Sequence, residues 1–96
     1  MKSQMIRAAE SIATNIVEGS AASSRREFAR FIDVSIKSSS ELEYHLLLAK
    51  DNGVLRQRLW ERLNGEVVEI RKMLSAFRRA LLKRDQDTSK EGEDPR

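Results

Sequence analysis

The sequence feature that most constrains the fold is a series of apolar residues in the last third of the chain. They recur alternately three and four positions apart over three heptads: Trp60, Leu63, Val67, Ile70, Leu74, Phe77 and Leu81. This spacing is typical of a helix that packs in a bundle or coiled coil. Further apolar residues widen the surface on both sides: Leu59, Met73 and Ala80 on one, Val68 and Leu82 on the other. We therefore expect a helix over residues 56–84 that contacts at least two neighbours.

Two more helices are expected before it. Over residues 2–18, apolar residues recur at steps of four, three and four, and Gly19 follows where a left-handed C-terminal cap is expected. A Ser-x-x-Glu capping box, Ser24 to Glu27, begins a second helix that Asn52-Gly53 ends, giving residues 24–52. A second match to the box at Ser38-x-x-Glu41 leaves a break near residue 38 open.

Composition supports one all-α domain, an antiparallel up-and-down helical bundle over residues 1–84. The chain has 96 residues and a single proline, Pro95. Residues 85–96 hold five acids and two bases, a net charge of −3, and no large apolar residue, so we expect a disordered acidic tail. Because the whole chain carries +3, the bundle itself carries +6. A basic bundle favours polyanions as partners.

Several classes of function find no support in the residues. The chain has no cysteine, which excludes disulfides and thiolate metal sites and fits a cytoplasmic protein. No apolar stretch is long enough for a signal peptide or a membrane span. The one histidine, His45, has only Glu41 within helical reach and lacks the partners of a metal or catalytic site. We therefore expect no enzyme, no metal and no cofactor.

Three segments of the chain are similar to one known family. They are Ser11-Ile12-Ala13-Thr14-Asn15-Ile16-Val17-Glu18-Gly19, Glu27-Phe28-Ala29-Arg30-Phe31-Ile32, and the stretch from Ser38 through Glu41-Leu42-Glu43 to Leu46-Leu47-Leu48-Ala49-Lys50. They resemble the four-helix-bundle proteins first noticed as products of intervening sequences in bacterial 23S ribosomal RNA genes. The accessory variability protein of diversity-generating retroelements is related to them. The resemblance covers about residues 3–83.

This resemblance implies a continuous second helix and a ring-like homopentamer with a basic surface. For the retroelement relatives it implies binding to nucleic acid and to a reverse transcriptase. Three features depart from the family pattern. We expect no counterpart of the family's first helix here, so that three helices remain and the chain is either a shortened version or has a vacant groove that something else fills. Ala13 stands where a proline is usual, and Lys37 where a glycine is common.

Basic residues off the apolar seam form two candidate nucleic-acid-binding patches. One is on the third helix (Arg71, Lys72, Arg78 and Arg79) and the other at the start of the second (Arg25, Arg26 and Arg30). The leading hypothesis is a homo-oligomer that binds RNA or another nucleic acid electrostatically, through its backbone. The alternative is a protein-interaction module whose open groove binds a partner helix. The polar residues of the family-like segments are interpreted as an interhelical network: Asn15, Glu18, Ser38 and Glu41.

Overall fold

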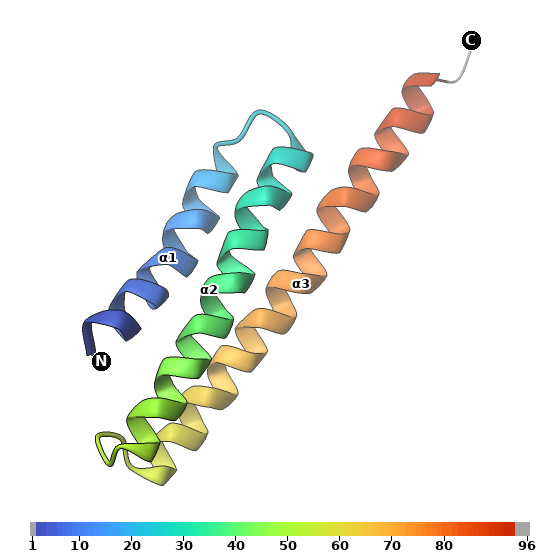
Figure 1. Ribbon diagram of the computed structural model, residues 1–96. Coiled ribbons are helices and arrows are strands. Elements are labelled where there is room, and N and C mark those ends of the chain that lie inside the picture. Colours follow the sequence, from blue (N-terminus) through green and yellow to red (C-terminus); the bar gives the residue numbers. More distant parts are fainter. Residues whose placement is uncertain (1, 94–96) are drawn as a thin grey trace.

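The computed structural model describes the backbone of residues 2–93 and the side chains of residues 2–84. Three helices make up the fold: α1 (Lys2–Ser20), α2 (Arg25–Asp51) and α3 (Gln57–Glu93), each antiparallel to the one before it (Figure 1). Over the described backbone there is no strand. The all-α prediction is therefore confirmed. None of these helices is long and apolar enough to cross a bilayer.

The helix α2 begins and ends where the sequence signals stand. Ser24 is the N-cap, and its Oγ accepts a hydrogen bond from the Glu27 backbone N–H at 3.1 Å. The Glu27 carboxylate accepts from the Ser23 hydroxyl at 3.0 Å, so only half of the predicted capping box forms. At the other end Gly53 has a φ of 75°, the left-handed conformation that suits glycine. Between these ends α2 is continuous through residue 38.

Gly19 does not cap α1, which corrects the prediction from sequence. It lies within the helix, is buried, and has no left-handed backbone. A Cβ at this position would lie 2.6 Å from Cδ1 of Phe28 and 2.9 Å from Cβ of Phe31. Glycine is therefore required here because α1 and α2 approach closely, and the helix ends one residue later.

The helix α3 is longer than the sequence predicts. Its backbone is helical to Glu93, beyond the expected end at residue 84, and residues 94–96 lie outside the described part of the chain. The physical reason is that no proline interrupts this segment before Pro95. Its glutamine, lysine and glutamate residues are also good helix formers. The disorder expected for residues 85–96 stays a prediction.

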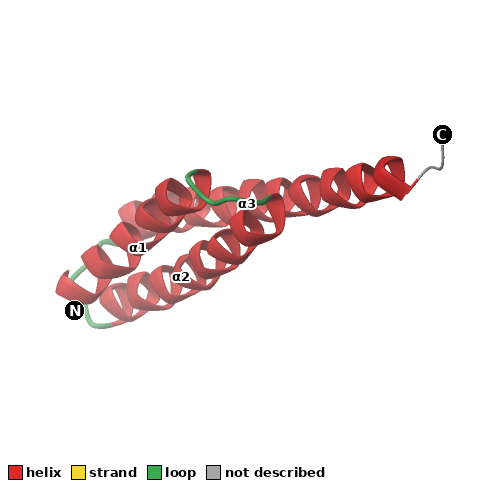
Figure 2. Ribbon diagram, turned by 90° about the horizontal axis from the view of Figure 1, so that it is seen from above, coloured by secondary structure: helices red, strands yellow, loops and turns green. Residues whose placement is uncertain are grey.

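The arrangement of the helices is open, with α2 in the middle. Both α1 and α3 pack along α2 and not against each other. The extents along the principal axes are 65 × 20 × 13 Å, so the molecule is elongated. The radius of gyration is 17.0 Å, whereas a compact domain of this length would have about 12–13 Å. Figure 2 shows α3 extending beyond the other two helices.

The core is correspondingly small. It consists of a cluster of buried apolar residues from all three helices: Ile12, Ala29, Ile32, Leu74 and Leu81. Small buried serines join α1 to α2, because the Ser35 hydroxyl donates to the Ile12 carbonyl at 2.8 Å. Between α2 and α3, the rings of Phe28 and Phe77 meet edge to face with centroids 5.2 Å apart.

Candidate nucleic-acid interface

The predicted basic stripe on α3 divides into two sets of side chains. Arg71 pairs with Glu43 of α2 at 2.5 Å, and Arg78 pairs with Asp33 of α2. Both arginines therefore face α2 and help to hold α3 against it, and their part in binding nucleic acid stays a prediction. Lys72 and Arg79, one residue further along in each case, are exposed.

The predicted patch at the start of α2 is also divided. Arg26 and Arg30 are exposed. Arg25 is half-buried and lines a hollow of about 440 Å³ at the turn between α1 and α2, together with Ala22, Ser23, Ser24 and Phe28. This hollow lies at the N-terminus of a long helix, where the backbone dipole favours negative charge.

The ion pairs fix the register between α2 and α3, and this register brings the two patches together. Because the helices are antiparallel, Arg30, which precedes Asp33, and Arg79, which follows Arg78, lie on the same side of that ion pair along the bundle. Lys37 lies between Asp33 and Glu43 on α2, and Lys72 lies between Arg71 and Arg78 on α3, so both lie between the two ion pairs. On each helix these cations are exposed and lie further from the core than the residues of the ion pairs. We call this set the basic face: Arg26, Arg30, Lys37, Lys72 and Arg79.

The predicted polar network forms only in part. The Asn15 amide donates to the Ser11 carbonyl at 2.8 Å and to the Ser11 hydroxyl at 3.2 Å, and that hydroxyl is 2.7 Å from the hydroxyl of Ser38. Asn15 and Ser38 are therefore connected through Ser11, a residue not among those predicted. Glu18 and Glu41 are exposed and lie outside this network.

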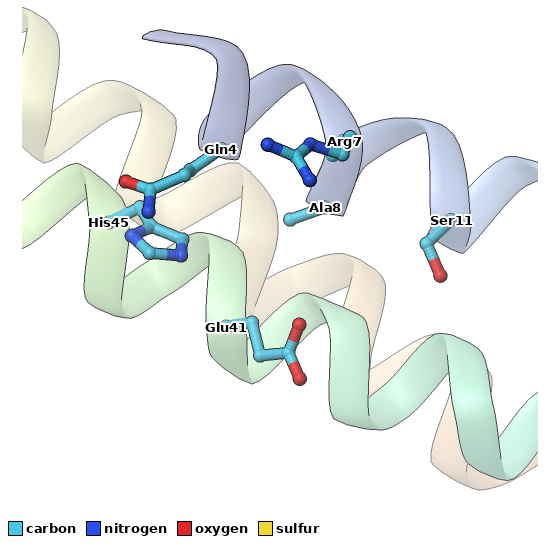
Figure 3. Close-up of a pocket in the computed structure, with 6 residues that line it drawn as sticks. All are labelled: Gln4, Arg7, Ala8, Ser11, Glu41 and His45. Atoms are coloured by element: carbon cyan, nitrogen blue, oxygen red, sulfur yellow. The ribbon is translucent and has the colours of Figure 1, made fainter. Parts of the chain in front are cut away.

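Glu41 instead lines a polar hollow between α1 and α2 of about 400 Å³ (Figure 3). Gln4, Arg7, Ala8 and Ser11 approach it from α1, and Glu41 and His45 from α2. The Nδ1 atom of His45 is buried and has no hydrogen-bond partner among the described residues. In the described part of the chain, no three histidine or acidic side chains are grouped to hold a metal ion.

The residues predicted to pack along α3 differ in burial. Val67, Leu74 and Leu81 are buried, whereas Trp60 and Leu63 are only half-buried. Ile70 is 36% exposed and Phe77 42% exposed. The apolar seam of α3 is therefore wider than α2 covers, in agreement with its sequence pattern.

An apolar groove accounts for part of this uncovered seam. It lies between α1 and α3 over α2 and has a volume of about 390 Å³. Almost all of its lining is apolar: Met5, Ile6 and Ala9 from α1, Leu42 and Leu46 from α2, and Leu63, Val67 and Ile70 from α3, with Glu66 at its side. We refer to this feature as the apolar groove.

A further hollow, between α2 and α3, is lined by aromatic residues. It has a volume of about 300 Å³ and is lined by Ser40, Glu43, Tyr44, Leu47, Trp60 and Asn64. The indole N–H of Trp60 is buried and has no hydrogen-bond partner in the described residues, which costs about 1–3 kcal/mol. The Lys50 ammonium lies 4.2 Å from the centre of the Trp60 ring. The sequence pattern assigned Trp60 to the core and did not predict this hollow.

Together these features define a small helical-bundle protein with an open core and a basic face. The chain belongs to the family of 23S rRNA-intervening sequence proteins, whose pattern it matches over residues 1–76. A solved structure of a protein of unknown function from the S23 ribosomal protein family of Bacteroides thetaiotaomicron is similar, with a TM-score of 0.75. The sequences are 31% identical, and the match covers 77% of this chain and 68% of that chain. No curated protein matches the chain. The resemblance expected from sequence is thereby confirmed.

Proposed function

We propose that this protein acts by binding rather than by catalysis, as a homo-oligomer in the cytoplasm whose basic face contacts the phosphate backbone of RNA or another nucleic acid. One observation carries the proposal. The exposed cations of α2 and α3, which are some forty residues apart in sequence, lie along the same stretch of the two antiparallel helices, which the Asp33–Arg78 and Glu43–Arg71 ion pairs join.

The spacing of these cations suits a repeating polyanion. Arg30 and Lys37 are seven residues apart on α2, as are Lys72 and Arg79 on α3, so the two cations on each helix lie about 10 Å apart along its axis. Arg25 adds a cation beside the N-terminus of α2. Contacts of this kind position a nucleic acid without reading its sequence.

The test is a charge reversal on the basic face. We expect Lys72→Glu combined with Arg79→Glu to weaken binding of a labelled RNA for all sequences alike, measured by fluorescence anisotropy. Because each phosphate contact releases a counterion, the unaltered protein should show log affinity falling steeply with log salt, and the variant a shallower slope.

The matched control reverses two exposed cations of α1, Lys2→Glu and Arg7→Glu, which changes the net charge equally but leaves the basic face intact. We expect this control to lose much less affinity. Equal losses in both variants would show that only net charge matters, and absence of binding at low ionic strength would reject the nucleic-acid role.

The apolar groove supports the oligomeric part of the proposal. Its lining continues into exposed apolar side chains of α3, with Met73 60% and Phe77 42% exposed. A single chain cannot cover this surface, and contiguous apolar patches on a protein surface mark interaction sites. We therefore propose that a second copy of the chain packs its own helices against the groove.

A second candidate function follows from the same groove. An amphipathic helix of a different protein would fit a groove lined by apolar residues of three helices, which is an established mode of recognition. The two functions differ in their salt dependence. A complex that survives high salt and is lost in a Phe77→Glu variant would favour this second function over nucleic-acid binding.

A further inference from the structure

The hollow between α2 and α3 is lined in part by a residue, Tyr44, that lies on the same face of α2 as the cations of the basic face. On α2, Tyr44 follows Arg30 and Lys37 at the next heptad position. On α3, Gly65 precedes Lys72 and Arg79 at the same interval. Residues seven apart on a helix share a face, so Tyr44 lies on the face of α2 that carries Arg30 and Lys37, and Gly65 lies on the face of α3 that carries Lys72 and Arg79.

These two heptad positions differ in composition from the ones that hold cations. The position on α2 holds an aromatic ring, and the position on α3 holds a glycine. Tyr44 is 58% exposed, and a Cβ added at Gly65 would meet no atom within 4 Å. The ring of Tyr44 is therefore accessible beside the hollow.

The remaining groups around the hollow suit a planar, polar heterocycle. Trp60 lines it, and its indole N–H is a donor without a partner. Ser40 and Asn64 offer a hydroxyl and an amide. The carboxylate of Glu43 also lines the hollow, but Arg71 pairs with it at 2.5 Å and offsets its repulsion of phosphate.

We propose that this hollow holds one unstacked base of a single-stranded nucleic acid whose phosphates follow the basic face. The inference rests on the proposed nucleic-acid function and goes beyond backbone contact. The base stacks on Tyr44, and Trp60, Ser40 and Asn64 surround it. Stacking on aromatic side chains tolerates any base and selects single strands over duplexes, in which bases remain paired.

Trp60 is the only tryptophan of the chain, so its fluorescence reports on this hollow. The test titrates the protein with a short oligouridylate, with an oligomer of equal length carrying abasic sugars, and with an RNA duplex. We expect the oligouridylate to quench Trp60 emission. The abasic oligomer should bind about 5- to 150-fold more weakly, corresponding to about 1–3 kcal/mol for one stacked base, and should leave the emission unchanged.

Variants of Tyr44 separate stacking from charge. Tyr44→Ala should remove the preference for the base-carrying oligomer, and Tyr44→Phe should keep it, because the ring remains. Val34→Ala, at another exposed apolar position of α2, is the matched control and should change nothing. The helical circular dichroism of each variant confirms that it folds.

The outcomes distinguish the two proposals. Equal affinity for abasic and base-carrying oligomers, or tighter binding of the duplex, would overturn the base-binding inference and leave backbone binding standing. A Tyr44→Ala variant with an unchanged preference would overturn it as well. If none of the three nucleic acids binds at low salt, the nucleic-acid function itself is wrong.

Discussion

Two helical glycines with opposite surroundings show what single residues contribute. Gly19 faces Phe28 and Phe31 at distances that no Cβ tolerates, whereas Gly65 faces open space. In the sequence both are glycines among helix-forming residues. Only the packing of α1 on α2 makes the first one necessary.

The first prediction concerns these two positions. Gly19→Ala should lower the free energy of unfolding by about 1–3 kcal/mol, because the new methyl group forces Phe28 and Phe31 apart. Gly65→Ala is the matched control and should raise it by about 0.5–1 kcal/mol, because alanine favours the helix and meets nothing. Urea denaturation followed by circular dichroism measures both. Equal effects of the two substitutions would contradict the close approach of α1 and α2.

At the scale of elements, α2 is central because, of the three described helices, it alone approaches both others closely. Its contact with α1 is made by small serines, and its contact with α3 by aromatic rings and two ion pairs. The ion pairs lie at the edge of the α2–α3 interface, where their charges set the register while remaining partly in water.

A double-mutant cycle on Asp33 and Arg78 tests the contribution of one ion pair. The side chains are 49% and 39% exposed, so we expect a coupling energy of only about 0.2–1 kcal/mol, measured from the free energies of unfolding of the two single alanine variants and the double variant. The coupling should decrease at high salt.

The control cycle uses Arg62 and Glu66, which pair within α3 at 3.6 Å and are 76% and 58% exposed. This pair joins no two helices, and its coupling should be at the lower end of the same range. A coupling energy of zero between Asp33 and Arg78 at low salt would show that the pair does not hold α3 in register.

At the scale of the whole molecule, the chain is extended and its core is shared by only a few residues. Ile12, Ala29, Ile32, Leu74 and Leu81 form the buried cluster, while several large apolar side chains remain exposed on α1 and α3. A small domain gains little stability from so limited a core. Association of copies would bury apolar side chains that a single chain leaves exposed.

The prediction at this scale is that Ile6→Lys combined with Ile70→Lys weakens self-association. These side chains line the apolar groove and are 47% and 36% exposed, so a charge there would be buried against the second copy. Sedimentation velocity over a concentration series should show an oligomer for the unaltered protein and a smaller species for the variant. The melting temperature of the unaltered protein should also rise with concentration.

Val54→Lys provides the control, because Val54 is 69% exposed and lies between α2 and α3 outside the groove. It should leave the oligomer intact. If the unaltered protein sediments as a monomer at every concentration, the proposed packing of a second copy on the groove is wrong.

Much of the fold could be predicted from the sequence, because helix formation depends on local patterns. The heptad spacing of α3 indicated both the helix and an apolar surface too wide for one neighbour. Ser24 and Gly53 marked the ends of α2 by their capping chemistry. The end of α3 was not predicted, since a charged segment without proline is compatible with both a helix and a disordered tail.

The candidate site could be predicted only in part, because it depends on contacts between distant segments. Charge and spacing identified the cations but not their surroundings. Arg71 and Lys72 are neighbours in sequence, yet Arg71 pairs with Glu43 of α2 whereas Lys72 is exposed. The antiparallel register of α2 and α3 decides which cations share the basic face and brings Tyr44 beside Trp60. Local sequence determines each helix and its apolar seam, whereas only tertiary packing determines which charges neutralise each other and which remain available to a ligand.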